Sequence, residues 1–224
     1  MIITIDGPAG VGKSSVAKLV AKELELNYLD TGAMYRCVTW AVLRRGVNPE
    51  DANAASEVAD ETNIRFEDDQ VFVESHNVTI AIRSDEVTAN ISPIADNPKI
   101  RQRLVDLQRK IAEEGNYICE GRDQGTVVFP DAICKIFLVA SAEERAARRV
   151  RQLEEAEVPV DFDTILAQQN ERDRRDYNRP VGKLVKADDA VEVITDNNTL
   201  KEVSSLLVQI IREKIKEKSQ KKSI

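Results

Sequence analysis

Residues 7–14 have the sequence Gly-Pro-Ala-Gly-Val-Gly-Lys-Ser, which fits the pattern G-x-x-x-x-G-K-S. The preceding residues 1–5 are mostly apolar and β-branched, which favours a buried strand. In residues 16–24 apolar side chains recur at helical spacing. Strand, glycine-rich loop and helix in this order form a phosphate-binding loop, because the loop N–H groups and the helix N-terminus both attract an anion. The stretch therefore predicts a site for a nucleoside triphosphate.

The side chains of this loop have separate expected roles. Lys13 can reach the β- and γ-phosphates, and the hydroxyl of Ser14 can ligate Mg²⁺. The alternative is a glycine-rich turn that fits the pattern by chance, and the flanks on both sides argue against it. The residues expected to contact the triphosphate here are Gly7, Pro8, Ala9, Gly10, Val11, Gly12, Lys13, Ser14 and Ser15.

Composition limits the other possibilities. The chain has 224 residues, which is enough for one large domain. Its net charge of −7 disfavours general binding to nucleic acid or to a membrane surface. Three widely spaced cysteines without a C-x-x-C pair predict neither a zinc site nor a disulfide framework, and one histidine excludes a multi-histidine metal site. A strand-like run begins at Ile2 and no apolar run approaches about 20 residues, so we expect a soluble, cytoplasmic protein without a leader or a membrane span.

A second strand is expected at residues 27–30, followed by a helix to Arg44 that Thr31 can cap. Arg36 falls in the first turns of this helix, where a cation opposes the helix dipole. That position favours a nearby anion, so Arg36 is a candidate ligand residue.

The pattern then changes to short strands. Residues 64–66 and 71–73 read as a hairpin and residues 78–82 as a third strand, so we interpret about 63–88 as a small antiparallel subdomain inserted into an α/β core. Ser92-Pro93 and Asn97-Pro98 are read as the start of the next helix, which runs from about residue 99 to about residue 114.

A polar segment follows the predicted core strand at residues 117–119. Ligands of doubly wound folds collect beyond the carboxyl ends of strands, so Gly121-Arg122-Asp123 is a candidate contact for an anionic substrate. The alternative is a salt bridge within the loop.

Arginines crowd two helices near the carboxyl terminus. A strand is expected at residues 135–139, and Ser141 with Glu144 forms a capping box at the start of the next helix. An acidic break at residues 154–163 separates the two helices, as in a mobile flap whose arginines could stabilise charge on a transferring phosphoryl group. A solvated charged face is the alternative. The arginines are Arg145, Arg148, Arg172, Arg175 and Arg179.

Two absent motifs narrow the class. The apolar run at residues 135–139 continues into Ala140-Ser141 and does not end in the Asp of a Walker B motif. No Asn-Lys-x-Asp guanine-reading motif occurs either, so a small-molecule phosphotransferase is favoured over a motor or a GTPase. Three segments, Thr4–Ser15, Leu29–Arg36 and Gly121–Ala132, together resemble the bacterial cytidylate kinases, which are P-loop nucleoside monophosphate kinases. The resemblance extends over nearly the whole chain.

The resemblance implies an α/β fold of the P-loop NTPase type. Its five-stranded parallel core sheet is flanked by helices, with an inserted antiparallel β subdomain in the monophosphate-binding region and a short lid. Applied to this chain, it implies a single kinase domain. The expected divisions are a core at 1–38 and 115–224, a monophosphate-binding region at 39–114 with the insert at about 63–88, and a lid at about 150–165.

The resemblance also implies the activity and the site. The reaction is transfer of the ATP γ-phosphate to CMP or dCMP with Mg²⁺, with Lys13, Arg122, Arg172 and Arg179 as catalytic residues and Ser14 toward the metal. Arg148 joins the loop residues in binding ATP. The residues implied for CMP are Thr31, Arg36, Ser92, Arg101, Arg122, Asp123, Arg172, Asp176 and Arg179.

Within that set, Thr31, Ser92, Arg101 and Asp123 resemble the group that reads cytosine. Arg36, Arg122 and Arg179 resemble the phosphate clamp, and Arg172 and Asp176 the ribose contacts. We expect a monomer that uses no nucleic acid or membrane partner. The alternatives are another small-molecule P-loop kinase, acting on UMP, AMP or a non-nucleotide acceptor, and a nucleotide-sensing protein without turnover.

Overall fold

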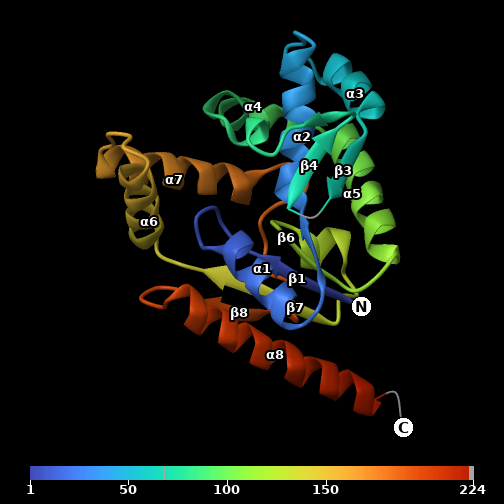
Figure 1. Ribbon diagram of the computed structural model, residues 1–224, viewed down its shortest axis with the longest axis vertical. Helices are drawn as coiled ribbons and strands as arrows, with labels where there is room; N and C mark the ends of the chain where they lie inside the picture. The colour runs from blue at the N-terminus through green and yellow to red at the C-terminus, as the bar shows by residue number, and fades with distance from the viewer. Residues whose placement is uncertain (68, 222–224) are drawn as a thin grey trace. The chain divides into compact units, whose positions relative to one another are not determined.

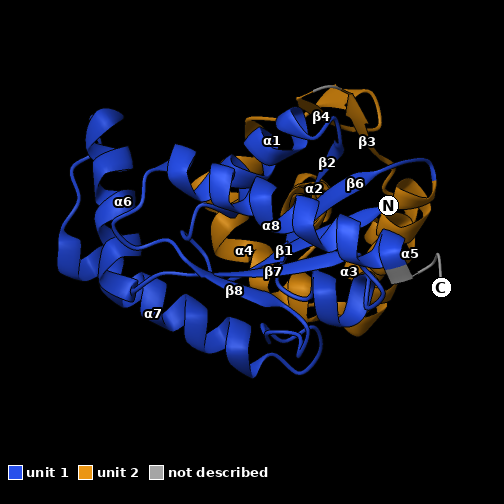
Figure 2. Cartoon of the chain, turned by 90° about the horizontal axis from the view of Figure 1, so that it is seen from below, with its two compact units in different colours: residues 1–29, 114–224 blue, residues 30–113 orange. Residues whose placement is uncertain are grey.

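A computed structural model describes residues 1–67 and 69–221 (Figure 1). The chain divides into two compact units (Figure 2): unit 1 is Met1–Leu29 with Glu114–Ile224, and unit 2 is Asp30–Glu113. The elements in chain order are β1 (Ile2–Asp6), α1 (Lys13–Glu23), β2 (Asn27–Asp30), α2 (Thr31–Arg44), α3 (Ala52–Glu61), β3 (Ile64–Glu67), β4 (Gln70–Val73), β5 (His76–Asn77), the 3-10 turn η1 (Ala81–Arg83), α4 (Asp85–Asp96), α5 (Pro98–Glu113), β6 (Tyr117–Gly121), the π-helical turn η2 (Gln124–Val128), β7 (Cys134–Val139), α6 (Ala142–Glu155), α7 (Phe162–Asn178), β8 (Val191–Ile194) and α8 (Leu200–Lys221).

The larger sheet has five strands among the described residues, in the order β2-β6-β1-β7-β8. Its strands are parallel, and the register places Asp6 of β1 beside Gly121 of β6 and Phe137 of β7. The carboxyl ends of these strands therefore meet at one edge, where ligands of such sheets collect. The expected α/β class with a five-stranded parallel sheet is confirmed.

Helices α1 and α8 cover one face of this sheet and lie side by side in Figure 1. Their apolar side chains share one buried cluster with β1 and β7, because helical and alternating patterns each place an apolar face toward the same layer. The cluster includes Ile3, Ile5, Val16, Val20, Ile136, Leu207 and Ile211. The core thus holds the strand and the helix on both sides of residues 7–12.

Unit 2 is built around α2, which packs against α3, α4, α5, η1 and β4. Its antiparallel sheet has the order β3-β4-β5, and Ile64 pairs with Val73 and Glu67 with Gln70. The predicted hairpin is confirmed.

The predicted third strand at residues 78–82 is wrong. The third strand is the two-residue β5, and residues 81–83 form the turn η1. The side chain of Asn77 accepts hydrogen bonds from the backbone N–H of Thr79 at 3.1 Å and from its hydroxyl at 2.7 Å. This local turn competes with the sheet, so the β-branched residues that follow leave the ladder.

The predicted helix start at Ser92-Pro93 is also wrong, because both residues lie inside α4. That helix begins after Ser84, whose hydroxyl accepts from the N–H of Val87 at 3.3 Å, and its first turn carries two acidic residues. Such a cap and first turn start a helix independently of the later proline. A second helix starts at Pro98, as expected.

The cap of α2 is Asp30 and not Thr31. The carboxylate of Asp30 accepts from the N–H of Ala33 at 2.9 Å, and Thr31 is the first residue of the helix. An Asp at this position satisfies an otherwise unpaired N–H and carries charge that the dipole favours.

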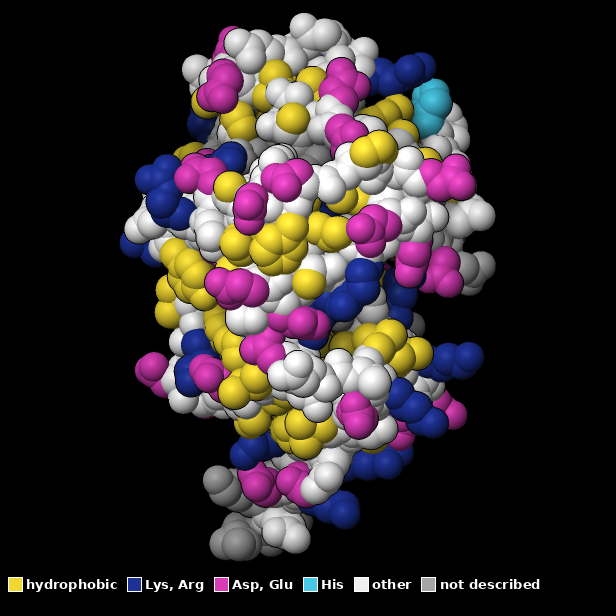
Figure 3. All heavy atoms as spheres, turned by 90° about the vertical axis from the view of Figure 1, so that its left-hand side faces the viewer, with side chains coloured by type: hydrophobic (Ala, Val, Ile, Leu, Met, Phe, Trp, Pro, Cys, Tyr) yellow, Lys and Arg dark blue, Asp and Glu magenta, His cyan; other side chains and the backbone are white. Residues whose placement is uncertain are grey.

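The surface is mixed in charge. On the face drawn in Figure 3, Lys and Arg side chains alternate with Asp and Glu side chains and with apolar ones. Within the described part of the chain, no helix is long and apolar enough to cross a membrane.

Candidate active site

The loop between β1 and α1 has backbone angles that residues other than glycine rarely adopt. Gly7, Gly10 and Gly12 have φ angles of 151°, 82° and 92°. A Cβ atom on Gly7 would lie 2.3 Å from the carbonyl oxygen of Leu138 in β7, so any side chain there would clash with the sheet. The loop is thus pressed against the carboxyl end of the sheet.

Lys13, the first residue of α1, is folded over this loop. Its Nζ atom donates to the carbonyl oxygens of Gly7 at 2.8 Å and Pro8 at 2.7 Å, and the residue is 6 % exposed. Burial, together with the nearby positive charge of Arg122, lowers the pKa of Lys13 from 10.5 to about 7. A polyanion placed here would stabilise the charged form of the lysine.

Ser14 contacts a carboxylate from a distant strand. Its hydroxyl donates to Glu120 Oε1 at 2.5 Å, and the hydroxyl of Tyr28 reaches the same oxygen at 3.2 Å. Hydroxyl and carboxylate oxygens suit Mg²⁺, which binds through few protein ligands, several waters and substrate phosphates. Among the described residues no group of three or more His, Cys, Asp or Glu side chains could hold a metal alone.

Sequence reasoning missed Glu120 as a site residue. It is 5 % exposed and is the last residue but one of β6, directly before the Gly-Arg-Asp segment. A carboxylate at the carboxyl end of a core strand was the available signal.

A cluster of opposite charges joins the Gly-Arg-Asp segment to α7. Arg122 Nε donates to Asp176 Oδ2 at 2.7 Å, and Arg179 Nη2 donates to Asp176 Oδ1 at 2.8 Å. Burial alone would raise the pKa of Asp176, but the charges of Arg122 and Arg179 outweigh it, so the pKa lies below its usual value. Arg172, on the same helix, adds to this fall and to that of Lys13. The structure therefore brings these four predicted residues into one charged cluster with Lys13.

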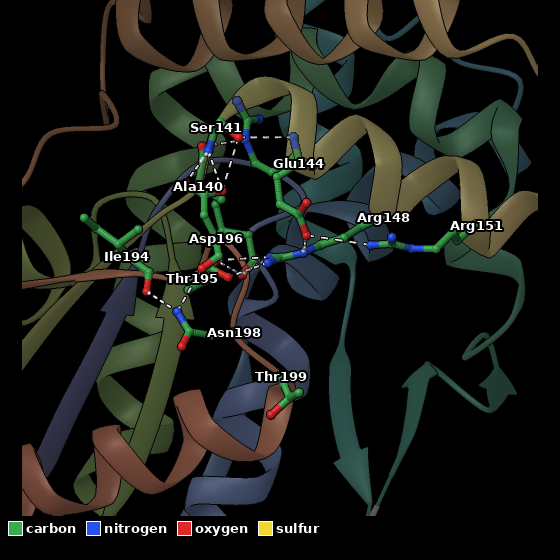
Figure 4. A network of polar contacts seen from close by, with 12 residues as sticks. Ala140, Ser141, Glu144, Arg148, Arg151, Ile194, Thr195, Asp196, Asn198 and Thr199 are labelled. Atoms are coloured by element: carbon green, nitrogen blue, oxygen red, sulfur yellow. Dashed lines mark hydrogen bonds and ion pairs between the residues drawn. The ribbon is translucent and has the colours of Figure 1, made fainter.

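Arg148 of α6 reaches the phosphate-binding loop through backbone atoms (Figure 4). Its guanidinium donates to Thr195 O at 2.5 Å, to Thr195 Oγ1 at 3.1 Å and to Val11 O at 3.5 Å. Glu144 pairs with the same guanidinium at 2.9 Å. Arg148 thus ties α6, the loop after β8 and the phosphate-binding loop together.

The capping box predicted at Ser141 is only half present. Its hydroxyl accepts from the N–H of Glu144 at 3.2 Å, but its own N–H donates to Asp196 at 3.0 Å (Figure 4). A hollow of about 480 Å³ adjoins these groups. It is lined by Ser141, Glu143, Glu144, Ala147, Phe162, Asp196 and Asn197.

Arg145, three residues before Arg148 in α6, is held in a similar way. Its Nη1 donates to Ala9 O at 3.0 Å, and its Nη2 pairs with Asp173 of α7 at 2.5 Å. Arg145 is only 4 % exposed, so the alternative interpretation of these arginines as a solvated charged face does not hold for it.

Four predicted residues for CMP belong to unit 2. Arg36 Nη1 donates to Ile82 O at 3.1 Å and to Thr88 Oγ1 at 2.9 Å. Arg101 donates to Ala95 O at 3.3 Å, and its guanidinium lies 5.5 Å from the ring centre of Tyr35. Thr31 is 2 % exposed at the start of α2, and Ser92 lies in α4. The other five residues predicted for CMP belong to unit 1.

A phosphate-binding loop at the edge of a parallel sheet, with its lysine inside an arginine cluster, defines a P-loop kinase. The family model described as cytidylate kinase matches residues 3–213. A cytidylate kinase of Rhodopirellula baltica is 49 % identical over 95 % of this chain and 93 % of its own, and one of Listeria monocytogenes is 46 % identical over 95 % and 96 %. The chain belongs to the cytidylate kinase family, which confirms the resemblance seen in the sequence.

A solved structure supports the fold independently of close relationship. The gluconokinase of Sinorhizobium meliloti is similar with a TM-score of 0.53 at 15 % identity, over 99 % of this chain and 97 % of its own.

Proposed function

We propose that the protein transfers the γ-phosphoryl group of ATP to CMP or dCMP, giving ADP with CDP or dCDP, in a Mg²⁺-dependent reaction. The observation that carries this proposal is that Lys13 of the phosphate-binding loop shares its electrostatic environment with Arg122, Arg172 and Asp176. Within unit 1, the loop that would bind the phosphoryl donor therefore interacts electrostatically with arginines that would bind the phosphoryl acceptor. Membership of the cytidylate kinase family supports the same reaction.

On the donor side, the N–H groups of residues 7–15 and the N-terminus of α1 bind the triphosphate. Lys13, which now donates to two loop carbonyls, turns to the β- and γ-phosphates. Ser14 and Glu120 would hold Mg²⁺, which neutralises phosphate charge when bound. Arg148 supports the loop through its Val11 contact, and the hollow beside Ser141 offers carboxylates to the amino group of a purine.

On the acceptor side, guanidinium groups neutralise the monophosphate. Arg36, Arg122 and Arg179 form this clamp, and Arg172 and Asp176 contact the ribose. Phosphoryl transfer needs little more than alignment and charge neutralisation, so direct in-line attack by a phosphate oxygen requires no covalent intermediate.

Base selection follows from hydrogen-bond chemistry. Ser92 and Asp123 accept from the exocyclic amine of cytosine, Arg101 donates to N3 or O2, and Thr31 completes the group. Uracil carries a carbonyl at the position of the amine, which would leave these acceptors unpaired. Buried unpaired acceptors strongly disfavour binding, so the site rejects UMP.

We also propose a cytoplasmic monomer that works on small molecules alone, without nucleic acid or a membrane. Membership of the cytidylate kinase family does not favour the alternative, a P-loop kinase for UMP, AMP or a non-nucleotide acceptor.

The test is ADP release with ATP and Mg²⁺ and each of CMP, dCMP, UMP, AMP and GMP. We expect rapid turnover with CMP and dCMP and much slower turnover with UMP. Asp123→Ala should lower kcat/KM for CMP by about 10- to 100-fold, the loss expected for one hydrogen bond to a charged group. Asp188→Ala, which removes an exposed carboxylate, is the control. Equal rates with CMP and UMP would refute the base assignment, and no turnover with any monophosphate would refute the kinase.

A further inference from the structure

Asp6, the last residue of β1, is a buried carboxylate to which no part of the reaction has been assigned. It is 4 % exposed. Its Oδ1 accepts from the N–H of Gln124 at 2.9 Å, and its Oδ2 accepts from the N–H of Gly125 at 2.7 Å. Both carboxylate oxygens are therefore used on two consecutive N–H groups of one turn.

These two N–H groups begin η2, and the residue before them is Asp123. Asp123 occupies the capping position of this turn, yet its own side chain makes no capping hydrogen bond. The cap comes instead from Asp6 on the neighbouring strand. This division keeps the Asp123 carboxylate out of the capping role that an aspartate at such a position usually has.

The Arg122–Asp123 segment is consequently held at both ends. On one side Gly121 is fixed in the sheet opposite Asp6 itself. On the other side Gln124 and Gly125 are bonded to the same aspartate. One residue of β1 thus sets the position of the two residues between them.

Close packing leaves this turn no room to shift toward β1. A Cβ atom on Gly125 would lie 3.0 Å from Thr4 Oγ1 and 3.4 Å from Asp6 Oδ2. Burying a carboxylate is costly unless hydrogen bonds compensate, so a neutral acceptor would be the cheaper way to hold a turn. A charged acceptor binds both N–H groups more strongly and defines their direction more narrowly.

We propose that Asp6 is a positioning residue that sets the place of the Arg122–Asp123 segment and thereby the preference for cytosine over uracil. This inference rests on the proposed function, in which Asp123 reads the base.

The test is Asp6→Asn, measured with CMP and with UMP. Asn keeps the shape, but its amide offers one acceptor and turns an NH₂ group toward an N–H donor. We expect KM for CMP to rise at least about tenfold, the CMP-to-UMP ratio of kcat/KM to fall at least about tenfold, and KM for ATP to stay within about twofold, because a lost hydrogen bond to a charged group has this size.

Leu207→Ala is the matched control, because it leaves a cavity in the core beside α8 and does not alter the Arg122–Asp123 segment. It should lower the Tm and leave the CMP-to-UMP ratio unchanged. If Asp6→Asn behaves like this control, with a lower Tm and an unchanged ratio, its role is structural and the inference is overturned.

A second pair of variants moves the same turn without changing charge. Gly125→Ala places its Cβ against Thr4 Oγ1, so the ratio should fall as in Asp6→Asn. Thr4→Ala combined with Gly125→Ala removes that contact and should restore part of the ratio. An unchanged ratio in Gly125→Ala overturns the inference even if Asp6→Asn fails to fold.

The wild-type ratio separates the two proposals. A wild-type enzyme that does not distinguish CMP from UMP overturns the base-reading function and this inference together. A selective wild type with an equally selective Asp6→Asn variant overturns the inference alone.

Discussion

Replacing Asp6 by Asn should remove a pH dependence from the stability of the protein. Burial raises the pKa of the Asp6 carboxyl from 3.8 to about 6, although the N–H groups of Gly125 and Gln124 lower it in part. The folded state therefore keeps this proton in a range of pH where the unfolded chain has released it. The free energy of unfolding must fall as the pH rises through that range.

The size of the effect follows from the two pKa values. Below pH 3.8 both the folded and the unfolded state carry the proton, and above about pH 6 both have lost it. The change in the free energy of unfolding is therefore confined to the range between these two pH values. A rise from 3.8 to about 6 corresponds to about 3 kcal/mol, since each pKa unit is worth about 1.4 kcal/mol. The Asn variant has no such proton, so its free energy of unfolding lacks this pH-dependent contribution.

Urea unfolding of both proteins between about pH 4 and about pH 8 measures the difference directly. Other titrating groups are common to both proteins and largely cancel in the comparison. As the pH rises, the free energy of unfolding of the wild type should fall by about 3 kcal/mol relative to that of the variant. Most of this fall should occur below about pH 6.5. A difference that is constant, or that grows in favour of wild type with rising pH, would refute the reasoning, because it would mean that the two N–H groups compensate for burial.

Three further predictions concern the donor side. Lys13→Ala should lower kcat by at least about 100-fold with the Tm retained, the scale seen when one group that stabilises transition-state charge is lost; near-normal turnover would contradict its role. Because burial lowers the pKa of Lys13 to about 7 and phosphate oxygens should raise it again, ATP binding at about pH 8 should take up protons. The buffer dependence of the calorimetric binding enthalpy measures this uptake, and a buffer-independent enthalpy would count against it. Glu120→Gln should raise the Mg²⁺ concentration for half-maximal rate by about 10-fold. The control Tyr28→Phe keeps the Glu120 carboxylate and should change this concentration little. An unchanged Mg²⁺ requirement in Glu120→Gln would exclude Glu120 from the metal site.

Local patterns predicted most of the elements correctly. The hairpin of β3 and β4 followed from two short apolar runs, and the helix at residues 98–113 from apolar spacing. The errors also have local causes. Residues 78–82 carry strand-forming side chains, but the Asn77 side chain bonds to Thr79 and turns the chain away. Pro93 suggested a helix start, whereas Ser84 had already begun the helix nine residues earlier.

In the candidate site, too, the features that depend on neighbouring residues were predicted, and the contacts between residues far apart in the chain were not. The phosphate-binding loop with its flanking strand and helix was predicted from the sequence, as were the proposed roles of Lys13 and Ser14, because each prediction depends on residues only a few positions apart. The pairing of Ser14 with Glu120 spans 106 positions, and that of Gly125 with Asp6 spans 119. No periodicity or spacing encodes such contacts, since they arise only when parallel strands align their carboxyl ends at one edge of the sheet. The sequence by itself therefore determined which chemistry the chain carries, and only the tertiary structure decided which carboxylate supports which group.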